Sequence, residues 1–157
     1  MFTQRGKIQQ YLKQYQELFG ERIYFPEDVF KENQNNTTTN SSTLNEYYKK
    51  IKDCLDCSLG YSRSSFVFGV GNPNADLVFV GEAPGHNEDM KGEPFVGRAG
   101  KLLDKILAAI SLSRNDVYIC NVLKCRPPEN RNPSSEEIEK CRPYLDTQLN
   151  MIHPKVI

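Results

Sequence analysis

Apolar residues along the chain follow two alternating patterns, one typical of amphipathic helices and one typical of buried strands. Helical spacing appears in four stretches: residues 4–19, 44–51, 99–112 and 134–152. Short continuous apolar runs, which predict strands, occupy four others: residues 66–70, 75–80, 117–122 and 154–157. Strands that alternate with helices predict an α/β fold with a mainly parallel central sheet flanked by helices.

Two of the predicted helices carry start signals. Thr43 precedes an apolar helical stretch, and Glu46 follows three residues later as a capping-box partner. Ser134 or Ser135 opens the last helix, with Glu137 or Ile138 three residues on. We therefore expect helices to begin at these positions.

A polar tract divides the chain into two parts. Residues 33–43 contain only Asn, Gln, Thr and Ser, and such a segment has nothing to bury, which predicts a flexible linker. We expect residues 1–43 to form a helical appendage and linker, and residues 44–157 to form one domain. A sheet that stops at Val156-Ile157 would lack its later strands, so we expect this domain to be incomplete at its C-terminus.

Composition narrows the class of protein. The 20 basic and 20 acidic residues cancel, which excludes a histone-like protein but leaves room for a local basic patch. No run of 18 apolar residues and no signal peptide is present, so we expect a cytoplasmic protein without a membrane segment. In that compartment 5 cysteines indicate thiols or metal ligands rather than disulfides.

Four cysteines have the spacing of a metal centre. Cys54 and Cys57 form a C-x2-C pair, and Cys125 and Cys141 supply two more thiols from a distant segment. This spacing fits structural zinc or a four-iron cluster, with unligated thiols as the alternative. Cys120 lies inside an apolar strand, and we interpret it as a core residue.

Two glycine-rich loops follow the 75–80 strand. Residues 81–89 begin with Gly-Glu-Ala-Pro-Gly, at the carboxyl end of a strand, where α/β sheets bind ligands. Residues 92–100 present one aromatic ring, Phe95, just before a helix whose start can face an anion. Each loop is also compatible with an ordinary tight turn between strand and helix.

Together these motifs closely resemble the family 4, iron–sulfur uracil-DNA glycosylases. The resemblance is carried, in order, by residues 80–85, Glu88-Asp89, residues 94–100 and residues 120–128, with Arg131, Pro133 and Cys141 after them. It covers about residues 44–157 and extends to the module at the front of certain phage DNA polymerases. It implies uracil-containing DNA as the partner, hydrolysis of the N-glycosidic bond of uracil as the reaction, and a monomeric protein.

The resemblance also implies a role for each cysteine of the set. Cys54, Cys57, Cys125 and Cys141 would hold a structural 4Fe–4S cluster. The cluster would fix the loop of residues 126–133 against DNA, where its arginines meet phosphates. A solvated basic loop is the alternative.

In the implied base pocket, Phe95 would stack on the extruded uracil and Asn121 would read its edge, donating to O4 and accepting from N3–H. The backbone at Glu82 and Ala83 would meet the O2 side. Either Glu82 or Glu88 would orient water or favour the sugar cation, and Glu88 is also a candidate for excluding a 5-methyl group. Both acids remain open as exposed loop carboxylates, and Asn121 as a strand-end cap.

The sequence departs from the family at one motif. Family members carry a C-terminal His-Pro-Ser loop whose histidine contacts uracil, and His153-Pro154-Lys155 precedes a predicted strand instead. This makes activity of the 157-residue chain doubtful and leaves a second hypothesis, a catalytically impaired DNA-binding iron–sulfur module that assists a polymerase or repair partner. An iron–sulfur electron carrier ranks last, because the ligand spacing is unlike that of ferredoxins.

Overall fold

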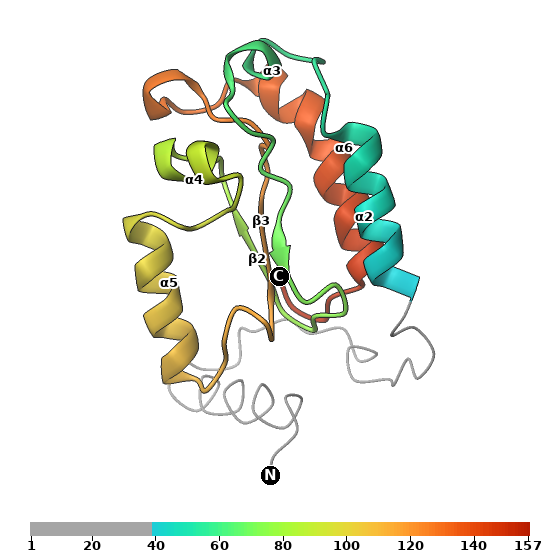
Figure 1. Cartoon of the computed structure of the whole chain (residues 1–157), viewed down its shortest axis with the longest axis vertical. Helices are drawn as coiled ribbons and strands as arrows, with labels where there is room; N and C mark the ends of the chain where they lie inside the picture. Colours follow the sequence, from blue (N-terminus) through green and yellow to red (C-terminus); the bar gives the residue numbers. More distant parts are fainter. Residues whose placement is uncertain (1–38) are drawn as a thin grey trace.

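The computed structural model describes residues 39–157 and shows helices on both sides of a small sheet (Figure 1). The helices in chain order are α2 (Thr39–Ile51), α3 (Leu59–Ser62), α4 (His86–Lys91), α5 (Arg98–Ala109), the 3-10 turn η1 (Pro128–Asn130) and α6 (Ser135–Ile152). α2 and α6 pack side by side over one face of the sheet, and α5 lies over the other. The predicted α/β class is therefore confirmed.

The sheet has the order β1 (Val70–Gly71), β3 (Tyr118–Asn121), β2 (Val78–Gly81). β2 pairs with β3 in parallel, and β1 pairs with β3 antiparallel. Leu77 and Val156 form an additional parallel bridge, which places the predicted C-terminal strand segment beside the start of β2. The sheet is thus mixed, with β2 and β3 parallel and β1 antiparallel to β3.

Residues of β3 alternate between two cores, as period-2 geometry requires. Tyr118 and Cys120 face the core under α2 and α6, whereas Ile119 packs with Leu103 and Leu107 of α5. Cys120 has no exposed surface, which confirms it as a core residue. This central strand fixes the place where Asn121 leaves the sheet.

Three sequence-based predictions need correction. α2 begins at Thr39, so Thr43 lies inside the helix and the end of the expected linker is helical. The expected strand 66–70 joins the sheet only at Val70, because Gly69 just before it takes a φ of 147° that interrupts a regular strand. The strand expected at residues 75–80 is shorter and begins later, as β2 over Val78–Gly81.

Other predictions agree with the structure, and one cannot be compared with it. Ser134 caps α6 through a capping box with Glu137, as the sequence indicates. The short helices α3 and α4 were not predicted from the sequence, since each is too short to show a helical period. The expected helix at residues 4–19 and most of the polar tract lie outside the described residues.

Candidate nucleobase slot and metal centre

The carboxyl ends of β2 and β3 bring Gly81 and Asn121 side by side, since these two residues are register partners. A Cβ atom placed on Gly81 would lie 2.3 Å from Asn121 Oδ1 and 2.8 Å from ring atoms Cε2 and Cζ of Phe95. The amide and the ring therefore converge on one point in front of Gly81, although they are 26 residues apart in the chain. Only glycine leaves room for this approach.

Asn121 is held rigidly by its neighbours. Its side chain and backbone are buried, with 2% of the residue exposed, and its carbonyl accepts a 2.8 Å bond from Lys124 Nζ. The next backbone N–H, that of Val122, donates to the Gly81 carbonyl at 2.8 Å. Within the described chain no group hydrogen bonds to the Asn121 side-chain amide, so the amide is available to a ligand.

Phe95 lies in a loop that is braced from several sides. It adopts a φ of 54°, which is uncommon for an aromatic residue. Glu88 Oε1 accepts the backbone N–H groups of Val96 at 2.9 Å and Gly97 at 2.8 Å. Gly100 in the first turn of α5 packs directly on the Phe95 carbonyl, because a Cβ there would lie 1.6 Å from that oxygen.

The two candidate acids occupy different positions. Glu82 follows β2, is exposed, and its carbonyl accepts the Leu123 N–H at 3.0 Å. Glu88 is half-buried in α4, and one of its carboxylate oxygens is occupied by the loop that carries Phe95. Ala83 lies between them in the chain and packs against the cysteine-containing core. We call the space in front of Gly81, between Phe95 and Asn121, the slot. The turn at residues 81–85 therefore connects the slot to the core that contains the cysteines.

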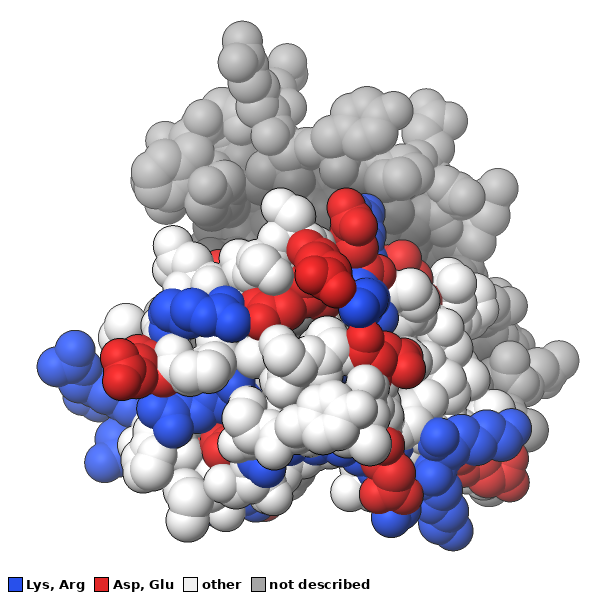
Figure 2. All heavy atoms as spheres, turned by 90° about the horizontal axis from the view of Figure 1, so that it is seen from above, with Lys and Arg blue, Asp and Glu red and all other residues white. Residues whose placement is uncertain are grey.

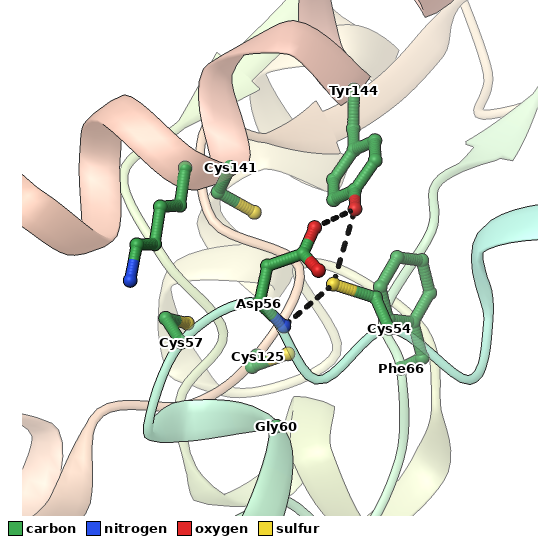
Figure 3. A pocket seen from close by; sticks show the side chains of 9 residues that line it. Cys54, Asp56, Cys57, Gly60, Phe66, Cys125, Cys141 and Tyr144 are labelled. Carbon is green, nitrogen blue, oxygen red and sulfur yellow. Dashed lines mark hydrogen bonds between the residues drawn. The ribbon is translucent and has the colours of Figure 1, made fainter.

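Four cysteines from three segments line one pocket (Figure 3). Cys54 and Cys57 follow α2, Cys125 follows β3, and Cys141 belongs to α6. Their sulfur atoms point toward the same space, which is also lined by Phe66 and Tyr144. Among the described residues, no three Cys, His, Asp or Glu side chains are grouped for a single metal ion.

Hydrogen-bond donors surround these sulfur atoms. Arg63 Nη1 donates to Cys125 Sγ at 3.2 Å, and the Lys124 N–H donates to Cys141 Sγ at 3.2 Å. Cys54 Sγ accepts the Asp56 N–H at 3.5 Å and lies 3.1 Å from the Tyr144 hydroxyl, whose single proton also faces the Asp56 carboxylate at 2.5 Å. Donors of this kind suit thiolates rather than neutral thiols.

Lys124 strengthens this conclusion. It is fully buried, and in the described part of the chain no carboxylate forms an ion pair with it. Burial lowers the pKa of Lys124, and its electrostatic neighbours Cys120 and Cys141 oppose that shift. Because a buried cation is costly without an anion nearby, the site fits an anionic thiolate centre on the Cys141 side.

Without a metal, the thiols of Cys125 and Cys141 would stay protonated at neutral pH. Burial raises the pKa of Cys141 to about 11 and also raises the pKa of Cys125, although Arg63 opposes the shift at Cys125. Coordination to iron or zinc would replace the proton on each thiol, so metal binding here would release protons.

The arginines of the loop at residues 126–133 already have partners. Arg131 forms a two-pronged pair with Glu137, at 2.9 and 2.6 Å, and Arg126 contacts Asn130 at 2.8 Å and His86 at 3.3 Å. Figure 2 shows basic and acidic groups interspersed on the end of the molecule it views, with no single sign covering it. A contact with phosphates therefore stays a prediction for this loop.

Several residues of these sites were missed by sequence reasoning. Lys124, Arg63 and Tyr144 contact the slot or the sulfur atoms, and Asp89 accepts the backbone N–H groups of Ser64 and Ser65 at 2.9 to 3.1 Å. The signal that could have found Lys124 and Asp89 is a charged residue inside or beside an apolar motif. Nothing in the sequence pairs Arg63 with Cys125, 62 residues away.

His153 lies far from the slot, as its sequence context indicates. It caps the C-terminus of α6 and precedes Val156, which pairs with Leu77 before the start of β2. Gly81 is at the other end of that strand. The His-Pro-Lys segment therefore lies near the amino end of β2, whereas Phe95 and Asn121 lie at its carboxyl end.

Gly81 and Asn121 end parallel strands of an α/β domain, with the Phe95 ring beside them, and this end of such a sheet is where α/β proteins bind ligands. The family model described as the uracil DNA glycosylase superfamily matches residues 68–157. The match covers more than half of the chain, and the chain belongs to this superfamily.

Curated relatives agree with this membership. The chain is 57% identical over 115 residues to a type-4 uracil-DNA glycosylase of Archaeoglobus fulgidus, which covers 73% of this chain and 58% of that protein. It is 50% identical over 109 residues to a type-4 uracil-DNA glycosylase of Thermotoga maritima, with 69% of this chain and 57% of that protein covered. A DNA polymerase of Bacillus phage SP01 is 34% identical over 90 residues, which are 57% of this chain and 10% of the polymerase. The chain thus spans little more than half the length of the glycosylases.

No helix in residues 39–157 has the length and apolar character needed to cross a bilayer.

Proposed function

We propose that the protein is a uracil-DNA glycosylase that hydrolyses the N-glycosidic bond of uracil in DNA. The observation that carries the proposal is the convergence of the Phe95 ring and the Asn121 amide in front of Gly81. A flat ring next to a hydrogen-bonding amide suits an extruded base, because stacking supplies affinity and edge contacts supply identity. The type-4 glycosylases named above support this choice of substrate.

In this proposal Phe95 stacks on the uracil and Asn121 reads its edge, donating to O4 and accepting from N3–H. Cytosine presents the reverse pattern at these positions. The backbone of Glu82 and Ala83 meets the O2 side, where negative charge develops as the bond breaks, and oriented donors there stabilise the departing base.

We assign the two acids different roles. Glu82 is exposed at the end of β2, so it is the acid that orients water or favours the sugar cation. Glu88 shapes the pocket wall, because its Oε1 already accepts two backbone N–H groups of the loop that carries Phe95.

The cysteine pocket holds a 4Fe–4S cluster in this proposal, with Cys54, Cys57, Cys125 and Cys141 as the ligands. The donors on three of the sulfur atoms and the buried Lys124 support an anionic centre. The cluster supplies structural support, tying the end of α2 and the middle of α6 to the segment after β3. A monomeric cytoplasmic protein completes the proposal, since reducing conditions keep such thiols available.

The second candidate is a DNA-binding iron–sulfur module without catalysis. It is favoured by the placement of the 2 histidines. His86 contacts Arg126, and His153 lies near the amino end of β2, away from Gly81. The three atoms nearest to a Cβ on Gly81 belong to Asn121 and Phe95.

An excision assay separates these functions. Purified protein is incubated with single- and double-stranded oligonucleotides that contain one uracil, and abasic product is measured beside equilibrium DNA binding. We expect product with the wild type and a loss of about 100-fold or more with Asn121→Ala. Asn150→Ala is the control, because Asn150 is exposed on α6. Binding without product favours the second candidate, and neither binding nor product overturns both.

A further inference from the structure

Arg114 lies in the connection between α5 and β3, and its guanidinium reaches the loop that carries Phe95. Nη1 donates to the Pro94 carbonyl at 3.2 Å, and Nη2 donates to the Phe95 carbonyl. Nε donates to Asp104 Oδ1 of α5 at 2.6 Å. One planar side chain thus joins a carboxylate to two successive backbone carbonyls.

The loop needs such support because its conformation is unfavourable. A φ of 54° at a residue such as Phe95 is strained and persists only when the surroundings fix it. Glu88 holds the N–H side of the loop through Val96 and Gly97. Arg114 binds the carbonyls of Pro94 and Phe95, so the two charged residues fix both the N–H and the carbonyl groups of the loop.

We propose that Arg114, oriented by Asp104, is a positioning residue that fixes the Phe95 ring against Gly81 and thereby sets the width of the nucleobase slot. The inference rests on the proposed function of that slot. A lysine ammonium has no planar fork, so it cannot satisfy both carbonyls and the carboxylate in the same geometry. Arg114 does not face the reacting atoms and acts only through Phe95.

The test is a double-mutant cycle between Arg114→Lys and Phe95→Leu, with kcat and KM measured on a uracil oligonucleotide. We expect Arg114→Lys alone to lower kcat about tenfold, because a small misplacement of a substrate-positioning group is costly. In the Phe95→Leu background the same change is expected to have less than about a twofold effect, since the group it positions is gone. Asp104→Asn is expected to lower kcat about threefold.

Arg142→Lys is the matched control, because Arg142 forms only a 3.8 Å surface pair with Asp146 on α6. We expect it to leave kcat and KM unchanged. Equal losses from Arg114→Lys in both backgrounds would overturn the inference, as would no loss in either.

A structure of unliganded Arg114→Lys separates this inference from the proposed function. We expect Phe95 to leave the left-handed region and its ring to move away from Gly81, while the rest of the fold is retained. This result stands even if the wild type excises no uracil, in which case only the proposed function fails. An unchanged ring position overturns the inference.

Discussion

The cysteine pocket and the nucleobase slot are held together in opposite ways. In the cysteine pocket, side chains from three segments meet around sulfur atoms, and a buried lysine has cysteines as its electrostatic neighbours. The slot is held mainly through backbone groups. Its two strand ends are paired, Gly81 leaves room for the neighbouring side chains, and the loop that carries Phe95 is hydrogen bonded through its N–H and carbonyl groups. Under the proposed function the first site would gain stability from a bound cluster, whereas the second is formed by contacts within the protein itself.

The largest expected effect comes from removing a cysteine ligand. Cys141→Ala should abolish the brown absorption at about 400 nm expected of a 4Fe–4S cluster and lower the free energy of unfolding by at least about 3 kcal/mol. Absorption spectra, iron analysis and denaturant unfolding measure this. Cys120→Ala is the control, since Cys120 is buried in the sheet core and should keep the colour at a cost of about 1 kcal/mol. A colourless wild type with one zinc would contradict the cluster.

The next effect concerns the slot. Gly81→Ala should reduce uracil excision by about 100-fold or more, because its Cβ would displace Asn121 Oδ1 or the Phe95 ring. Gly92→Ala is matched to it, since Gly92 has a φ of 76° but a Cβ there meets only Ser65, at 3.6 Å or more. That control should lose about 1 kcal/mol of stability and keep its activity. Equal loss of excision in both variants would show that the slot is not specially constrained.

Lys124→Met distinguishes the two states of the cysteine pocket. With the cluster present, the change removes a buried cation from beside an anionic centre and should destabilise the protein by about 2 kcal/mol or more. With the cluster removed, the cost should be clearly smaller, because a buried lysine is then itself unfavourable. Denaturant unfolding of both forms measures the difference. An equal cost in the two forms would contradict an electrostatic role for Lys124.

The smallest expected effect concerns the pair of Arg131 and Glu137, outside both sites. The Arg131 guanidinium lowers the pKa of Glu137 to about 2, from an ordinary value of about 4.5. A depressed pKa adds stability that is fully present above pH 4.5 and is lost as the pH falls toward 2. Because Arg131 is 46% exposed, we expect about 1 kcal/mol rather than the full shift.

Glu137→Gln tests this pair while keeping an acceptor for the helix cap. Its free energy of unfolding should fall below that of the wild type at pH 7, and the two should approach each other near pH 2 to 3. A gap that is constant with pH would show that the pair contributes through packing and not through charge.

The sequence predicts the slot better than it predicts the surrounding fold. The nearness of Gly81 and Asn121 follows from the parallel pairing of the strands that they end. The place of Phe95 beside them was expected only from the resemblance to the family 4 glycosylases, because the residue lies in a loop. Arg114 and Lys124 could not be assigned in the same way, since their roles depend on how loops fold back on the sheet.

The errors in the fold also have physical causes. α2 extends into the Thr, Asn and Ser residues of the polar tract, because adding a residue to a helix fixed by packing at Leu44 costs little. The run at 66–70 is apolar enough for a strand, but only Val70 pairs with β3. The Val67 N–H instead donates to the Lys124 carbonyl, beyond the end of that strand, at 2.8 Å. Glycine conformations after it could not be read from hydrophobicity.

The most direct test of the central claim is a structure of the protein with free uracil bound. The account predicts the pyrimidine ring stacked on Phe95, with the Asn121 amide hydrogen bonded to O4 and N3–H and the base close to Gly81. Uracil bound elsewhere, or Phe95 and Asn121 found on different sides of Gly81, would contradict it.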